Sequence, residues 1–261
     1  MLDVVALEAE LSGTVFAGKL HFSAVTGSTN TDATEAARSG APHGSVYFAD
    51  EQRAGRGRGR HAWHSVAGQG LYVSVLLRPA MAAVHLPLLP LAAGLAAAAA
   101  IREASGLKVD LRWPNDLLLG ERKCGGILAE SKTEGAAVAF AVVGIGINVH
   151  QREFDPGLAT PATSLDNEAG RRVERQALLA ALLKSLEREA LGLEDEARLR
   201  AIPARVEQAS TWMRGRQVVV HGPQACAGVT DGLDEYGFLR VRTPAGVVTV
   251  QTGGIRAAEV G

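Results

Sequence analysis

The chain has 261 residues, with 27 Lys plus Arg, 28 Asp plus Glu and a formal net charge of -1. With 47% hydrophobic and 21% charged residues it has a globular composition, which excludes a mostly disordered or fibrous chain. The near-zero charge argues against bulk electrostatic binding of nucleic acid, although it allows local basic patches. Two widely separated cysteines, Cys124 and Cys226, predict neither a disulfide framework nor a zinc site, and favour a reduced, cytoplasmic protein.

The first part of the chain predicts strands that alternate with helices. A helix is expected over 3–11, and a second helix begins at Ser28 or Thr29, either of which can cap it, and ends near Arg38. Alternating or apolar runs predict strands over residues 19–25, 45–49, 71–78 and 107–113.

The most apolar stretch, residues 85–106, is rich in alanine and is interrupted by Pro87 and Pro90. Its continuous part, Leu91 to Ile101, is shorter than the roughly 17–25 residues that a bilayer span requires. The N-terminus also carries acidic residues where a secretory signal would carry basic ones. We therefore expect a buried core helix and no membrane association.

Further along the chain, two strands are expected over 127–131 and 136–149, on either side of a turn at Gly135. Strands joined by so short a turn indicate a mixed or antiparallel sheet. Residues 151–172 are expected as loop, and apolar residues at helical spacing predict a helix over 174–194.

After Trp212 the pattern changes to short strands separated by glycine-bearing turns, which is typical of a small β-barrel. We therefore predict two domains, with residues 1–210 forming the larger one and residues 211–261 the small one.

Four segments carry residues suited to chemistry. The first, Ser28-Thr29-Asn30, lies where a strand meets a helix, so hydroxyl groups and free backbone N–H groups would form a small polar site. The alternative is a simple helix cap. The second segment, residues 49–65, contains the Gly/Arg loop, residues 53–61, in which Arg56 and Arg58 alternate with glycines. Glycine allows the backbone to approach a ligand closely, and arginine binds phosphate well, so this composition predicts a phosphate-binding loop. The alternatives are a basic tract that binds nucleic acid and a solvated, flexible loop.

The third segment runs from Trp113-Pro114-Asn115-Asp116 to Lys123. If residues 116–119 and 124–130 form a hairpin around Gly120-Glu121, then Asp116 and Lys123 stand close across it. Such a pair could handle protons and bind phosphate, or could be a surface ion pair.

The fourth segment, GIGIN at residues 144–148, places two glycines in an apolar strand, which usually marks a close backbone approach. Its last residue is Asn148, whose side chain can read a base edge. The third glycine and the helix of a dinucleotide-binding fingerprint do not follow, which argues against a nicotinamide site.

Taken together and in this order, the segments resemble the biotin–protein ligases: Ser-Thr-Asn, GRGR with a Trp five residues after its last Arg, WPND, Lys-x-Gly-Gly-Ile-Leu and GIGIN. The resemblance implies an α+β fold with a class II aminoacyl-tRNA synthetase-like catalytic domain and a C-terminal SH3-like β-barrel. It implies that biotin and ATP form biotinyl-5′-AMP with Mg²⁺, and that biotin is then transferred to a lysine of a biotin carboxyl carrier protein. It also suggests a homodimer, with neither a nucleic-acid nor a membrane partner.

The resemblance also implies roles for individual residues. Lys123, Arg56 and Asp116 would be catalytic, with Lys123 bridging the biotin carboxylate and the α-phosphate and Asp116 orienting or deprotonating the incoming lysine. The expected biotin-binding residues are Ser28, Thr29, Asn30, Gln52, Arg56, Gly57, Arg58, Lys123 and Gly126. The expected nucleotide-binding residues are Arg58, Trp63, Asn115, Lys123 and Asn148. No metal ligand is expected.

Three departures from the family pattern stand out. Gly59 and Arg60 are out of step with the usual loop, Arg112 replaces the lysine before WPND, and the C-terminal Gly-Gly-Ile-Arg256 lacks the usual glutamate. The roles of Arg60 and Arg256 are therefore left open.

The residues before Gly27 are too few for a winged helix-turn-helix domain, so a form without the DNA-binding arm is expected.

Three alternatives remain at this point: a lipoate–protein ligase or related acyltransferase of the same architecture, a nucleic-acid-binding protein that uses the Gly/Arg loop, and an inactive scaffold. The biotin-type motifs argue against the first. The net charge argues against the second, and the presence of Lys123, Asp116 and Arg58 argues against the third.

Overall fold

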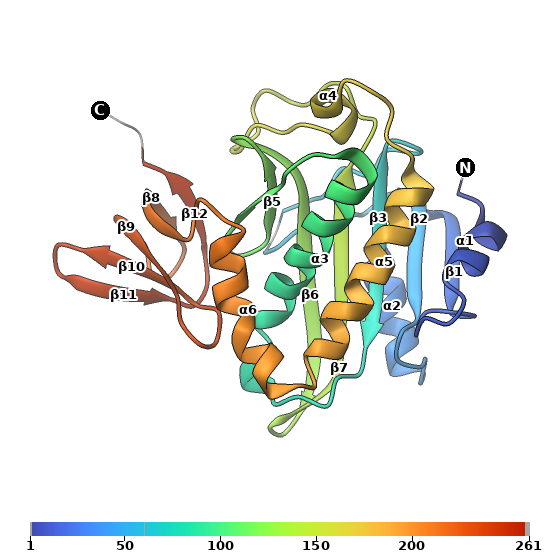
Figure 1. Ribbon diagram of the computed structural model, residues 1–261, viewed down its shortest axis with the longest axis horizontal. Coiled ribbons are helices and arrows are strands. Elements are labelled where there is room, and N and C mark those ends of the chain that lie inside the picture. Colours follow the sequence, from blue (N-terminus) through green and yellow to red (C-terminus); the bar gives the residue numbers. More distant parts are fainter. Residues whose placement is uncertain (1, 60, 259–261) are drawn as a thin grey trace.

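The computed structural model describes residues 2–59 and 61–258, and shows a large mixed sheet covered by helices, with a smaller sheet beside it (Figure 1). Arg60 and the last three residues lie outside the described residues, so the open question about Arg60 stays open.

Seven strands form the main sheet in the order β1-β2-β3-β7-β6-β5-β4, in which β1 and β2 are parallel and all other neighbours are antiparallel. The expected mixed sheet is thereby confirmed. The strands are β1 (Leu20–Thr26), β2 (Val46–Gln52), β3 (Gly70–Leu77), β4 (Asp110–Arg112), β5 (Asp116–Leu119), β6 (Arg122–Glu134) and β7 (Ala137–Asn148).

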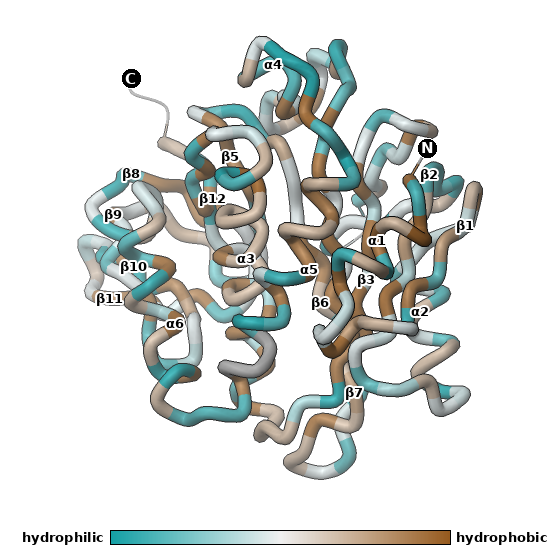
Figure 2. Tube along the Cα trace, turned by 45° about the vertical axis from the view of Figure 1, so that its right-hand side comes forward, coloured by the Kyte–Doolittle hydropathy of each residue, from teal (hydrophilic) through white to brown (hydrophobic). Residues whose placement is uncertain are grey.

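Helices cover both faces of this sheet. The larger hydrophobic core lies under α3 and α5, whereas a smaller cluster on the other face packs Ala33 and Ala37 of α2 against Leu76, Phe140 and Val142. Figure 2 shows the apolar residues concentrated in the central strands. The helices of this part are α1 (Val4–Glu10), α2 (Thr29–Arg38), the 3-10 turn η1 (Ala83–His85), α3 (Leu88–Ser105), α4 (Leu165–Ala169), α5 (Arg175–Gly192) and α6 (Glu196–Gln208).

Helix α3 (Leu88–Ser105) extends beyond the continuous apolar part, Leu91 to Ile101, at both ends. Pro87 stands at the N-cap and Pro90 in the first turn, where a missing N–H group leaves no helical hydrogen bond unmade. By length and composition α3 could cross a membrane, yet 61% of it is buried inside the fold, where it packs against α5, α6 and the sheet. The expectation of a buried core helix is confirmed.

Two helices were missed by the sequence patterns. The expected loop at 151–172 contains α4, which Ser164 caps by accepting a hydrogen bond from the Asn167 backbone N–H (3.3 Å). Helix α6 is likewise capped by Asp195, whose carboxylate accepts from two backbone N–H groups, and it tolerates Pro203 in its interior. The strand expected over 107–113 is reduced to β4.

The second sheet is antiparallel and has five strands in the order β11-β10-β9-β8-β12, with β11 and β12 as its edges. Its strands are β8 (Arg214–His221), β9 (Cys226–Leu233), β10 (Leu239–Thr243), β11 (Gly246–Val250) and β12 (Gly254–Ala257). The predicted division at residues 210 and 211 falls between α6 and β8. The Trp113 indole N–H donates to the Gly237 carbonyl (3.0 Å), which ties the WPND segment to this sheet; the Trp113–Pro114 bond is cis.

Candidate active site

A cavity of about 1000 Å³ lies on the face of the main sheet that carries α2 and extends to the edge of the second sheet. All thirteen site residues expected from the sequence line it: Ser28, Thr29, Asn30, Gln52, Arg56, Gly57, Arg58, Trp63, Asn115, Asp116, Lys123, Gly126 and Asn148. The fold therefore brings five separate sequence motifs to one place. Arg256 of β12 lines the same cavity.

The register of the sheet explains the floor of this cavity. Gly126 pairs with Gly146, and Gly144 pairs with both Leu128 and Ser74, so these residues share one face. A Cβ at Gly144 would overlap the Asn30 side chain, and one at Gly146 would lie 2.5 Å from the Trp63 indole. The two glycines thus mark a close approach, as predicted, and the approaching groups within the chain are the side chains of Asn30 and Trp63.

The Ser-Thr-Asn segment forms one end of the cavity. Ser28 occupies the N-cap position of α2, but its side chain makes no capping hydrogen bond. The Thr29 backbone N–H is instead bound by Gln52 Oε1 (2.9 Å), and Gln52 Nε2 donates to Ser65 Oγ (2.7 Å). This polar cluster joins the start of α2 to Gln52 of β2 and to Ser65, which is more than a simple helix cap provides.

Ser74 joins this cluster from β3, although no motif pointed to it. Its fully buried hydroxyl lies 2.6 Å from Asn30 Oδ1 and 2.7 Å from Thr29 Oγ1. Because the amide oxygen only accepts, the Ser74 hydroxyl donates in its contact with Asn30. The sequence signal for Ser74 was its position as a polar residue within the apolar run LYVSVLL, residues 71–77.

The predicted hairpin between β5 and β6 is confirmed, and it places Asp116 beside Lys123 with Oδ1 and Nζ 2.5 Å apart. Arg112 binds the other carboxylate oxygen at 2.5 Å, so Asp116 lies between two cations. Burial by itself raises the pKa of Asp116, but the charges and hydrogen bonds of Lys123 and Arg112 outweigh it and leave the pKa below its ordinary value.

The loop that follows β7 forms hydrogen bonds with this hairpin and with Arg112. The backbone of Lys123 bonds to Pro161 (2.8 Å) and Thr163 (2.9 Å), and Thr160 Oγ1 accepts from Arg112 (2.9 Å). Cys124 next to Lys123 is fully buried, and burial raises the pKa of its thiol to about 12. It is therefore a packed strand residue, as expected, and a poor nucleophile.

The Gly/Arg loop reaches two different elements. Arg56 forms a bidentate pair with Glu130 of β6 (2.9 and 2.7 Å), whereas Arg58 donates to the Gly253 carbonyl and to Thr252 Oγ1 at the second sheet. Burial lowers the pKa of Arg58, an effect that the charge of Asp116 opposes. Lys123 Nζ stands 5.6 Å from the centre of the Trp63 ring, within cation–π range. The cavity thus has a polar end and a cationic end.

The two asparagines of the motifs bond to the backbone. Asn115 Nδ2 donates to the Ile127 carbonyl (2.7 Å), and Asn148 Nδ2 donates to the Thr163 carbonyl (3.0 Å). Both side chains line the cavity, and these bonds hold the WPND segment and the loop after β7 in place.

Comparison with known proteins agrees with this geometry. The model of the Biotin/lipoate A/B protein ligase family matches residues 22–148. A biotin--[acetyl-CoA-carboxylase] ligase of Mycobacterium tuberculosis is 33% identical over 243 residues, which cover 89% of this chain and 86% of that protein. The bifunctional ligase/repressor BirA of Bacillus subtilis is 40% identical over 166 residues, 63% of this chain; the chain spans about half (51%) of BirA.

Among solved structures, a biotin protein ligase from Aquifex aeolicus in complex with biotin and ATP is 28% identical, with a TM-score of 0.78, and the match covers 92% of this chain and 100% of that one. The chain belongs to the Biotin/lipoate A/B protein ligase family.

Proposed function

We propose that this protein is an ATP-dependent biotin–protein ligase. One observation carries the proposal: the motif residues line a single cavity that has a polar end and a cationic end, and they include Ser28, Asn30, Arg58 and Lys123. The names of the Mycobacterium and Aquifex relatives, and the biotin and ATP bound to the Aquifex protein, support it.

The polar end would bind the head group of biotin. A ureido ring presents both N–H donors and a carbonyl acceptor, and the Thr29, Asn30 and Gln52 side chains supply both kinds of partner in fixed orientations. Because these side chains are held by one another and by Ser74, little conformational entropy would be lost on binding.

The cationic end would serve the first half-reaction. A carboxylate oxygen of biotin attacks the α-phosphorus of ATP, the bond to the bridging oxygen breaks, and biotinyl-5′-AMP and pyrophosphate are formed. Negative charge accumulates on the phosphate oxygens, and fixed cations such as Lys123, Arg56 and Arg58 stabilise it more in the transition state than in solution. The loop that carries the two arginines would also shield the adenylate from water.

In the second half-reaction the ε-amine of the carrier lysine attacks the acyl carbon, and AMP leaves. The amine must lose a proton, since a free lysine is mostly protonated near neutral pH. The low pKa of Asp116 makes it a weak base. Of the two expected roles, the charge of Asp116 therefore favours orienting the incoming ammonium group over removing its proton.

Mg²⁺ would enter with the phosphates of ATP. Within residues 2–59 and 61–258, no three His, Cys, Asp or Glu side chains are grouped so as to hold a metal ion. Mg²⁺ commonly binds through substrate phosphates and water with few protein ligands, which fits such a site.

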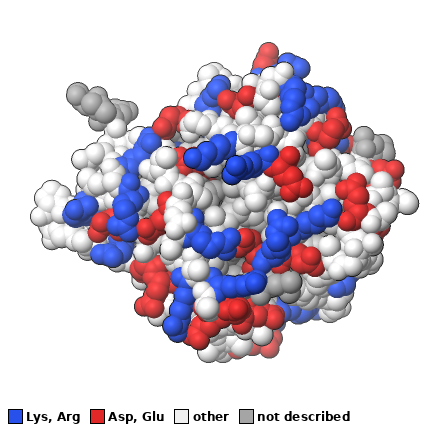
Figure 3. All heavy atoms as spheres, viewed as in Figure 1, with Lys and Arg blue, Asp and Glu red and all other residues white. Residues whose placement is uncertain are grey.

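The domain organisation is part of the same proposal. Residues 1–210 would form a class II aminoacyl-tRNA synthetase-like catalytic domain, and residues 211–261 an SH3-like domain. The carrier would be the biotin carboxyl carrier domain of a biotin-dependent carboxylase. A cytoplasmic location, a homodimer and the absence of nucleic-acid and membrane partners complete the proposal. Positive and negative side chains are interspersed over the face shown in Figure 3.

The decisive test is exchange of labelled pyrophosphate into ATP with Mg²⁺, run in parallel with biotin and with lipoate. Exchange that depends on biotin alone is expected. Exchange with lipoate alone would keep the fold and replace the substrate. No exchange with either acid would refute the adenylating mechanism, and salt-sensitive binding to random DNA would then favour the Gly/Arg loop as a nucleic-acid contact.

A further inference from the structure

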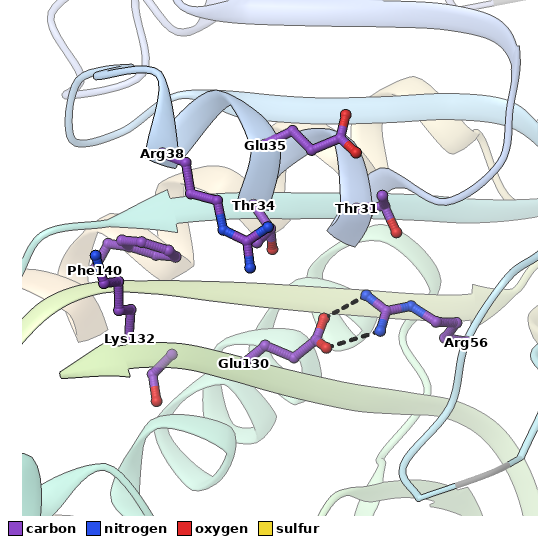
Figure 4. Close-up of a pocket in the computed structure, with 9 residues that line it drawn as sticks. Thr31, Thr34, Glu35, Arg38, Arg56, Glu130, Lys132 and Phe140 are labelled. Atoms are coloured by element: carbon purple, nitrogen blue, oxygen red, sulfur yellow. Dashed lines mark hydrogen bonds and ion pairs between the residues drawn. The ribbon is translucent and has the colours of Figure 1, made fainter.

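Glu130 of β6 contacts two of the expected ligand-binding residues, Asn30 and Arg56, although it is not itself one of the expected site residues. One carboxylate oxygen accepts from Arg56 Nη1 (2.9 Å), and the other accepts from Arg56 Nη2 (2.7 Å) and from Asn30 Nδ2 (2.8 Å). Figure 4 shows Arg56 reaching from its loop to the carboxylate on the strand. A single acidic side chain thus joins Asn30 to Arg56 of the Gly/Arg loop.

Through its contact with Asn30, Glu130 determines how the Asn30 amide is oriented. The two ends of an amide group have almost the same shape, but a carboxylate only accepts hydrogen bonds. The NH₂ group of Asn30 therefore faces Glu130, and its oxygen faces the Ser74 hydroxyl at 2.6 Å. A ligand that contacts Asn30 meets a defined pattern of donor and acceptor.

Through its contact with Arg56, Glu130 holds the Gly/Arg loop against the sheet. The loop is closed upon itself by backbone bonds from Gly57 to His61 (2.7 Å) and from Trp63 to Gly55 (2.8 Å). Arg56 joins this closed unit to β6. The exposed fractions are 45% for the Arg56 side chain and 33% for that of Glu130, so the bidentate pair is only partly screened by solvent.

We propose that Glu130 is a positioning residue that couples the polar end of the cavity to the Gly/Arg loop. It orients Asn30 and at the same time holds Arg56. The identity of the ligand rests on the proposed function, whereas the coupling depends only on the contacts of Glu130.

Limited trypsin digestion of the full-length protein tests the contact with the loop without any need for ligase activity. Trypsin must take the arginine side chain into its own pocket, so Arg56 has to leave Glu130 before the chain is cut after it. Arg53 in the same loop is an internal control, because its side chain is 75% exposed. The variants are Glu130→Ala, Glu130→Gln and, as matched control, Glu134→Gln, which removes a 73% exposed carboxylate from the same strand.

We expect the ratio of cleavage after Arg56 to cleavage after Arg53 to rise about two- to fivefold in both Glu130 variants, the range of a partly exposed ion pair. The ratio should stay unchanged in Glu134→Gln. General loosening of the loop would raise both cleavages together and leave the ratio at its wild-type value. An unchanged ratio in Glu130→Ala overturns the proposal.

The biotin dependence of pyrophosphate exchange tests the contact with Asn30. Glu130→Ala should raise KM for biotin by roughly tenfold, the effect of one charged hydrogen bond. Glu130→Gln should restore much of this loss, because its amide oxygen can still accept from Asn30. Equal KM values for the two variants would overturn the orienting role. If the wild-type protein shows no exchange, the proposed function fails, and the cleavage ratio alone decides whether Glu130 holds the loop.

Discussion

Replacing Gly144 by alanine should destabilise the fold by displacing Asn30. The new Cβ would overlap Asn30 Oδ1 and stand 2.8 Å from its Cγ, so rotating the amide about its own axis brings no relief. The whole Asn30 side chain has to move and give up its bonds to Ser74 (2.6 Å), Glu130 (2.8 Å) and Leu128 (3.3 Å).

The magnitude follows from these bonds. Two neutral hydrogen bonds of about 1 kcal/mol each and one to a charged group of about 2 kcal/mol sum to roughly 4 kcal/mol. The lower backbone entropy of the unfolded alanine variant offsets about 1 kcal/mol of this. The expected loss is therefore about 3 kcal/mol in the free energy of unfolding, or a fall in Tm of roughly 6–12 °C for a chain of this size.

Urea unfolding at pH 7 would measure this loss. The matched control is Gly254→Ala in β12, where an added Cβ meets no atom within 4 Å, so a change within about 0.5 kcal/mol is expected. If the collision with Asn30 is the cause, Gly144→Ala should no longer destabilise the fold once Asn30→Ala has removed the side chain, and should stabilise it by up to about 1 kcal/mol. Additive losses in the double variant, within about 0.5 kcal/mol, would refute the reasoning.

Further predictions concern the hairpin and α3. Lys123→Ala should abolish biotin-dependent pyrophosphate exchange, whereas Asp116→Ala should slow transfer from isolated adenylate to a carrier domain more than it slows exchange; equal loss in both steps would contradict that division. Because the pKa of Asp116 is lowered in the folded state, its ionised form adds stability above the unfolded value of about 3.9, and this is lost as pH falls toward the folded value. The difference in urea stability between wild type and Asp116→Asn should therefore narrow from pH 6 to pH 3, and a constant difference would show that Asp116 keeps its ordinary pKa. Gly94→Ala should raise the unfolding free energy by about 0.5–1 kcal/mol, because a Cβ there meets Leu111 and Ile127 at ordinary contact distances, 3.5 and 3.6 Å, inside a helix; a loss in thermal unfolding would mean that this space is not free.

Features that depend on local chemistry could be predicted from the sequence. The helix after Ser28, the hairpin at Gly120-Glu121 and the helix α5 were predictable from signals that act over a few residues: residue types typical of a helix start, turn residues, and apolar residues at helical spacing. Ser28 does occupy the N-cap position, although its side chain makes no capping bond. The contact between Asp116 and Lys123 was also predicted, because a short hairpin brings its two strands together; the register itself pairs Asp116 with Gly126 and Lys123 with Leu118. The five motifs were recognisable because each keeps its spacing along the chain.

Contacts between distant residues, by contrast, emerged only from the packing of the whole fold. Ser74 and Glu130 lie on strands with ordinary patterns, and their importance comes from the register that brings β3, β7 and β6 side by side under Asn30. Helix α6 was missed because its interior proline argues against a helix, and the buried residues that stabilise it lie in contact with α3. Arg58 meets Gly253, which lies 195 residues further along the chain. Such contacts depend on how strands and helices pack, and no local spacing in the sequence encodes that packing.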